Sequence, residues 1–132
     1  MQRKARGFGV GKLNGPGGKI KPDETIEDSV KREVKEETDL DVNDLEQVAE
    51  LEFIFEDNHD INNKVYAFRT FNYSGEFKDM GEGQLDWYNV EKLPLSEMWE
   101  DDSVWLVPAL RGDFQKKRFF YKDNAMTRYE EI

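Results

Sequence analysis

Three glutamates in one short stretch are the residues of this chain best suited to chemistry. Glu33, Glu36 and Glu37 lie in the segment Arg32-Glu33-Val34-Lys35-Glu36-Glu37. At helical pitch, positions three and four apart share a face, so the three carboxylates crowd together and weaken an isolated helix. A Mg²⁺ ion, which prefers oxygen ligands and is usually shared with substrate phosphates, would offset that repulsion. The cluster predicts phosphate chemistry, although such a cluster on its own is more often a solvated helix face.

The helix that must carry these glutamates is predicted over residues 26–38. Thr25 is a suitable N-cap, and apolar residues recur at every fourth position: Ile26, Val30 and Val34. Before the helix, residues 7–18 contain six glycines, which indicate a loop or a strand that another backbone or a ligand approaches closely. Their spacing matches neither a dinucleotide fingerprint nor a P-loop.

The rest of the chain predicts strands and a second helix. Alternating apolar residues indicate three strands, at residues 48–55, 64–71 and 84–90. A second helix, capped by Asp101, Asp102 or Ser103, is predicted to run through Leu110, and Pro108 is expected to shorten or kink it. A terminal hairpin pairs residues 118–121 with residues 126–129. Together these elements predict a mixed α/β fold in a single domain, residues 1–132.

Composition limits the function. The 132 residues carry a net charge of −10, which argues against nucleic-acid polymers as partners because these require a basic footprint. A free nucleotide stays open, since bound metal can neutralise its phosphates. The absence of cysteine excludes disulfides, thiolate catalysis and cysteine-based zinc sites. With no apolar run of about 18 residues and no secretory signal, we expect a cytoplasmic protein without a membrane partner.

The glutamates belong to a larger motif. Reading outward from them, the following residues stand in register: Gly18, Glu24, Arg32, Glu33, Val34, Glu36, Glu37 and Leu40. This frame resembles the Nudix box, G-x5-E-x7-R-E-U-x-E-E-x-G-U, in which U is aliphatic. Asp39 stands where the box has its last glycine, a residue that normally ends the helix in a left-handed conformation. Aspartate tolerates that geometry better than most residues, so we expect a small loss of stability and intact chemistry.

The resemblance implies a Mg²⁺-dependent hydrolase, with Mn²⁺ as a substitute ion, built on a mixed sheet between helices. The implied metal ligands are Glu33, Glu36, Glu37 and Glu82. Glu82, which matches a further acidic position of the family, is either a ligand or the general base. Arg32 is expected to pair with Glu24 and to orient the helix. Gly17 and Gly18 would let backbone amides approach the phosphates.

Two further segments, residues 6–19 and residues 98–103, resemble the oxidised purine nucleoside triphosphatase branch of the family. In that branch a tryptophan stacks on the purine and paired aspartates bind its edge, which implies these roles for Trp99, Asp101 and Asp102. The other implied base-pocket residues are Asn14, Phe8, Phe53 and Phe55. The implied reaction converts triphosphates of the 8-oxo-dGTP or 2-hydroxy-dATP type to the monophosphate and pyrophosphate, which cleanses the nucleotide pool and so serves DNA repair.

Each of these residues also has a purely structural interpretation. Trp99 can be core or surface filler, and the Asp101–Asp102 pair can be an N-cap with a spare charge. Phe8, Phe53 and Phe55 can be core residues, while Trp87 and Tyr88 are expected to pack within a strand. At the level of function, two alternatives stay open: a Nudix hydrolase of another nucleoside diphosphate-linked substrate, and a non-catalytic nucleotide-binding module.

The start of the chain departs from the family. The family has a long apolar strand, a turn and a second short strand before the Arg-Gly-Phe-Gly segment, whereas Met1 falls where that second strand ends. We therefore expect a sheet without its usual N-terminal strand, which would expose backbone and core. A misassigned start and a truncated chain are the favoured accounts; a partner strand or a rearranged terminus is the third. A monomer is expected, with strand exchange open, and this chain should be less stable than an upstream-extended version.

Overall fold

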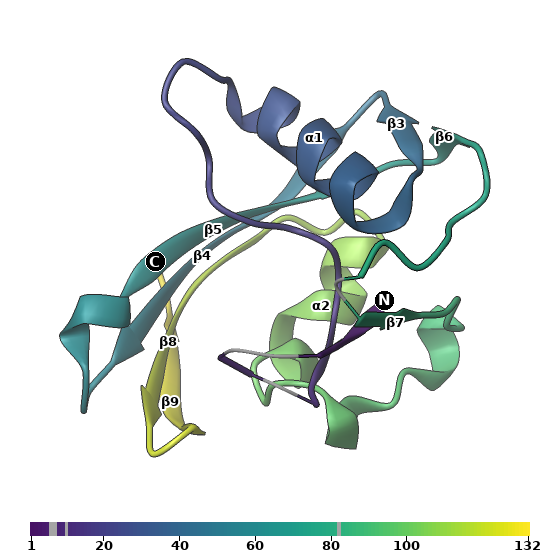
Figure 1. Ribbon diagram of the computed structural model, residues 1–132. Helices are drawn as coiled ribbons and strands as arrows, with labels where there is room; N and C mark the ends of the chain where they lie inside the picture. Colours follow the sequence, from purple (N-terminus) through teal and green to yellow (C-terminus); the bar gives the residue numbers. More distant parts are fainter. Residues whose placement is uncertain (6–7, 10, 82) are drawn as a thin grey trace. The chain divides into compact units, whose positions relative to one another are not determined.

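The computed structural model describes residues 1–5, 8–9, 11–81 and 83–132 (Figure 1). Its backbone contacts divide the chain into two compact units. Unit 1 comprises Met1–Leu45 and Thr70–Trp99, and unit 2 comprises Glu46–Arg69 and Glu100–Ile132. Among the described residues, no helix is long and apolar enough to cross a membrane. The expectation of a single domain stays a prediction.

Helix α1 (Ile26–Thr38) is the main element of unit 1, and both of its ends follow the predicted chemistry. At the N-terminus, the Thr25 hydroxyl accepts a 3.1 Å hydrogen bond from the Asp28 backbone N–H. At the C-terminus, Asp39 adopts the left-handed conformation with φ 66°, and its N–H donates to the Lys35 carbonyl. The aspartate therefore takes the backbone role of the glycine that the Nudix box has at this position.

Short strands complete unit 1. An antiparallel three-stranded sheet has the order β2 (Leu13–Asn14), β1 (Gln2–Lys4), β7 (Gly83–Leu85). A second, two-stranded sheet pairs β3 (Asp41–Asn43) with β6 (Asn72–Ser74). Two or three residues are too few to show a periodic pattern, so the sequence did not predict β1, β2, β3 or β6.

The strand predicted over residues 84–90 is wrong beyond Leu85. Two short 3-10 helices follow instead, Val90–Lys92 and Leu95–Glu97. Trp87, which was expected to pack within the strand, is 61% exposed. Its ring lies 5.5 Å from that of Phe77 and 5.7 Å from that of Tyr73. Apolar composition suggested a strand here, but Trp87 lies beyond the end of β7 and packs against Phe77 and against Tyr73 of β6.

Unit 2 consists of a four-stranded sheet and one helix (Figure 1). The strand order is β5 (Asn63–Arg69), β4 (Glu46–Phe55), β8 (Gln115–Lys122), β9 (Ala125–Glu131). Strands β4 and β8 are parallel, and the other neighbours are antiparallel. A 3-10 turn, His59–Ile61, lies in the predicted β4–β5 loop, and helix α2 spans Asp102–Leu110 with Pro108 inside it. Leu51 and Phe119 are fully buried in this unit.

The hairpins of unit 2 confirm the predicted pairings with one shortened strand. Asp123 and Asn124 connect β8 to β9 with φ values of 52° and 61°, a left-handed pair that suits a tight hairpin turn. Strand β5 ends at Arg69 rather than at Phe71. Phe71 is 84% exposed, so its apolar character did not place it in the sheet.

Candidate active site

A cavity of about 320 Å³ in unit 1 gathers the acidic cluster. Its lining residues come from helix α1, from strand β1 and from the segment that begins in β2: Glu33, Glu36, Glu37, Gln2, Lys4, Asn14, Gly15 and Gly17. The three glutamates were predicted to share one face of the helix, and the glycine segment was predicted to approach the phosphates. Gln2 and Lys4 were missed because a three-residue strand near the start of the chain carries no signal for function.

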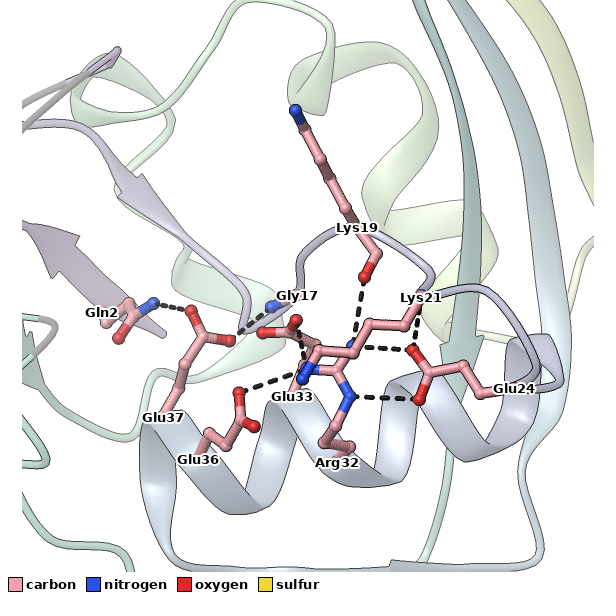
Figure 2. Close-up of polar contacts among 9 residues, drawn as sticks. All are labelled: Gln2, Gly17, Lys19, Lys21, Glu24, Arg32, Glu33, Glu36 and Glu37. Atoms are coloured by element: carbon pink, nitrogen blue, oxygen red, sulfur yellow. Dashed lines mark hydrogen bonds and ion pairs between the residues drawn. The ribbon is translucent and has the colours of Figure 1, made fainter.

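Arg32 ties the helix to the preceding loop (Figure 2). Its Nε and Nη2 atoms donate to the two oxygens of Glu24 at 3.1 and 2.7 Å. Its Nη1 atom donates to Glu33 at 2.8 Å and to Glu36 at 3.2 Å. The hydrogen bonds from Arg32 are the main reason that the pKa of Glu24 falls to about 2. The predicted Arg32–Glu24 pair is therefore present, and it also reaches two glutamates of the cluster.

Glu37 is held by donors from outside the helix (Figure 2). The amide Nε2 of Gln2 donates to Oε1 of Glu37 at 2.9 Å, and the backbone N–H of Gly17 donates to Oε2 at 2.8 Å. The next residue, Gly18, lies so close to the helix that a Cβ added there would be 2.4 Å from Oε1 of Glu33. Glycine is needed at this position because any larger residue would displace the Glu33 carboxylate.

These donors suit a hard divalent cation, because the cavity offers carboxylate oxygens from three neighbouring glutamates. In the part of the chain that the structure describes, no three acidic or histidine side chains converge enough to hold one ion. Arg32 instead bridges Glu33 and Glu36, while Gln2 and Gly17 hold Glu37. A bound cation would therefore replace the positive charge that Arg32 now places beside Glu33 and Glu36. Glu82 lies outside the described residues, so its role stays a prediction.

The predicted stacking residue of unit 1, Trp99, is covered by the segment that precedes β2. The ring of Phe8 stacks on it with centroids 5.3 Å apart and an interplanar angle of 16°. The Nζ atom of Lys12 lies 5.8 Å from its ring centroid, and a Cβ on Gly9 would lie 3.3 Å from the indole. Phe8 and Trp99 are therefore in contact, and their roles in a base pocket stay predictions. Asn14 lies on the acidic cavity, with its Oδ1 accepting from the Gly15 N–H at 3.0 Å.

The aspartate pair belongs to unit 2 and is buried. Asp101 is 4% exposed and Asp102 is 5% exposed. Asp101 accepts hydrogen bonds from the Tyr121 hydroxyl at 2.5 Å and from Trp105 Nε1 at 2.8 Å, and it makes no side-chain cap bond to helix α2. Burial raises the pKa of Asp102 to about 7, and the negative charge of Asp101 adds to the rise. Burial also raises the pKa of Asp101, against these two hydrogen bonds.

Tyr121 connects the aspartate pair to the predicted apolar pocket residues of unit 2. Its ring centroid lies 6.4 Å from that of Phe53 and 5.7 Å from that of Phe55, while its hydroxyl donates to Asp101. Unit 2 therefore brings Phe53, Phe55 and Asp101 together around a tyrosine that the sequence suggested only as a sheet residue. Its spacing in the hairpin gave no sign that its hydroxyl would reach a residue 20 positions away.

Comparisons with known proteins identify the class. The family model of the NUDIX domain matches residues 1–107, so the chain belongs to the Nudix family. It is 41% identical over 116 residues to an oxidized purine nucleoside triphosphate hydrolase of Danio rerio and 38% identical over 116 residues to one of Mus musculus. Each alignment covers 88% of this chain and 71% of the relative.

A solved structure agrees with this assignment. The MutT protein of Bacillus halodurans superposes with a TM-score of 0.84 and 26% identity, covering 98% of this chain and 86% of that protein. The chain therefore has the mixed α/β fold of the MutT protein, and with its family membership it is a Nudix hydrolase.

Proposed function

We propose that the chain hydrolyses oxidised purine nucleoside triphosphates, of the 8-oxo-dGTP or 2-hydroxy-dATP type, to the monophosphate and pyrophosphate. The observation that carries the proposal is the cavity in which Glu33, Glu36 and Glu37 face the glycine segment at Gly15 and Gly17. Acidic side chains and close backbone approach are what a metal-bound polyphosphate requires. The names of the Danio rerio and Mus musculus relatives support this substrate class.

The residues of the cavity have distinct tasks in this proposal. Glu33, Glu36 and Glu37 would hold Mg²⁺, or Mn²⁺ in its place, and the ion would neutralise phosphate charge and favour ionisation of water. Arg32 orients two of these carboxylates through Nη1. Lys4, on the cavity wall, would add positive charge beside the phosphates. A cavity carboxylate, or Glu82, would accept the proton of the attacking water.

For the base, we propose Trp99 as the stacking surface and Asp101 with Asp102 as the hydrogen-bonding groups. Stacking on an aromatic side chain contributes about 1–3 kcal/mol per base. Since the pKa of Asp102 is raised to about 7 by burial and by Asp101, the pair would hold one proton near neutral pH. It then offers both a donor and an acceptor, which suits oxidised guanine and oxidised adenine alike. Pocket roles for the following residues belong to the same proposal: Phe8, Asn14, Phe53, Phe55, Gly17 and Gly18.

We further propose that the protein acts as a monomer in the cytoplasm. Removal of oxidised triphosphates there would keep them from polymerases and so contribute to DNA repair.

The test is pyrophosphate release from 8-oxo-dGTP and from dGTP, with Mg²⁺ and after chelation of the ion. Wild type should prefer 8-oxo-dGTP and require the ion. Glu36→Gln should lower turnover by roughly 10³-fold, because it removes one carboxylate charge from the metal site. The matched control is Glu27→Gln, an exposed glutamate in the first turn of α1 and outside the cavity, which should keep wild-type turnover.

The remaining outcomes separate the alternatives. Ion-dependent turnover confined to another nucleotide would replace the substrate class while leaving the chemistry in place. No ion-dependent turnover of any nucleotide would overturn the proposal and favour a binding module.

A further inference from the structure

Gln2 is a buried polar residue of the acidic cavity to which the proposed reaction gives no task. The residue is 8% exposed, and its side chain lines the cavity from strand β1 and donates from Nε2 to Glu37 at 2.9 Å. Its carbonyl oxygen, Oε1, is buried and has no hydrogen-bond donor within reach among the described residues. An unpaired buried amide oxygen is unfavourable, so the position of this side chain needs a compensating task.

The orientation of this amide is determined by its neighbour. If the amide were turned over, Oε1 would face a carboxylate oxygen of Glu37, acceptor against acceptor, and the hydrogen bond would be lost. The backbone at Gln2 is fixed as well, because β1 is the middle strand and Gln2 pairs with Asn14 on one side and Leu85 on the other. Neither rotation of the amide nor a shift of the strand relieves the unpaired oxygen.

Glu37 is thus oriented from two directions. Gln2 donates to one oxygen from β1, and the Gly17 N–H donates to the other from the glycine segment. Carboxylates that ligate metals are typically oriented by hydrogen bonds of this kind, and loss of such a partner weakens metal binding.

We propose that Gln2 orients Glu37 toward the divalent cation. The inference rests on the proposed function, because it requires a cation in the acidic cavity. The unpaired Oε1 of Gln2 is the cost of keeping its Nε2 turned toward Glu37.

The test measures Mn²⁺ binding in the absence of nucleotide. Binding is detected as the loss of the electron paramagnetic resonance signal of free Mn²⁺. Gln2→Met keeps the volume and removes both polar atoms. It should raise the Kd for Mn²⁺ by roughly tenfold or more. The melting temperature of the ion-free protein should stay unchanged or rise, because the unpaired oxygen is gone. The matched control is Arg3→Met. Arg3 lies on the same strand, its guanidinium donates to Gly11 and Glu97, and it does not line the cavity.

The outcomes separate this inference from the function on which it rests. Wild-type Mn²⁺ affinity in Gln2→Met would overturn the role of Gln2 while leaving the metal site in place. Failure of the wild type itself to bind Mn²⁺ would overturn both. If Gln2→Met does not fold, a crystal structure of the wild type with Mn²⁺ decides the matter. Glu37 bound to the ion and still hydrogen-bonded to Gln2 supports the inference, and a Glu37 that has left Gln2 to reach the ion overturns it.

Discussion

The two units place carboxylates in opposite surroundings. In unit 1, hydrogen bonds from Arg32 lower the pKa of Glu24 to about 2, so this carboxylate is charged at any ordinary pH. In unit 2, burial and the charge of Asp101 raise the pKa of Asp102 to about 7, so this one is poised between its two forms. One functional group thus serves two purposes: fixed charge beside a cavity suited to cations, and a proton available for hydrogen bonding.

The largest effect on stability is expected at Asp102. In the folded protein its pKa is about 7, against 3.8 for an unperturbed aspartate, so folding favours the protonated form. Its contribution to stability is fully present below pH 3.8 and is lost as the pH rises through 7. Asp102→Asn removes this titration. At pH 8 the variant should gain about 2–4 kcal/mol of unfolding free energy over the wild type, with little difference near pH 4.

Urea unfolding of both proteins at several pH values measures that difference. Asp113→Asn, a change at an exposed aspartate of the same unit, is the control and should follow the wild type throughout. A difference between wild type and Asp102→Asn that does not change with pH would mean that Asp102 titrates normally. It would remove the contrast between the two units.

The next effect concerns space rather than charge in unit 1. A Cβ on residue 18 would lie 2.4 Å from the Glu33 carboxylate, which would have to leave its place beside Arg32. Gly18→Ala should lower turnover by roughly 10- to 100-fold, comparable to the loss of an orienting partner in a metal site. Stability should change little, because the atoms that must move are the end of one flexible side chain.

A double-mutant cycle with Glu33→Gln tests the cause. If Gly18 matters because it leaves room for Glu33, then Gly18→Ala should add almost no further loss of turnover on the Glu33→Gln background. Fully additive losses would show that Gly18 acts through something else, such as the backbone path of its loop.

Sequence reasoning succeeded where the signals were local. The Thr25 cap, the left-handed Asp39 and the Arg32–Glu24 pair all lie within one helix and its flanking residues. Spacing alone determines which of these side chains share a face. The acidic side of the site was therefore predictable in outline, down to the glutamates that line the cavity.

Contacts between distant segments could not be predicted in this way. Gln2 meets Glu37 across 35 positions, and Tyr121 meets Asp101 across 20. Each contact depends on sheet pairing that leaves no mark on the spacing of residues along the chain. Trp87 shows the converse, since its apolar ring suggested a strand but lies exposed beyond the end of β7. The hydrophobicity of a ring predicts that it packs against other apolar groups. Which groups these are depends on the tertiary structure.

The smallest effect is expected at Glu24, where the sign is opposite to that at Asp102. The folded pKa of Glu24 is lowered from 4.5 to about 2, so its contribution to stability is present above pH 4.5 and disappears as the pH falls toward 2. Glu24→Gln should lower the melting temperature at pH 7 by no more than about 3 °C, because partly exposed ion pairs are weak.

Melting curves between pH 7 and pH 2 should show that small difference vanish in acid, whereas the exposed Glu27→Gln should match the wild type at every pH. A difference that persists at pH 2 would assign the effect to lost packing instead of charge. Arg32 would then hold Glu33 and Glu36 without help from Glu24, and the contrast between the two units would rest on Asp102 alone.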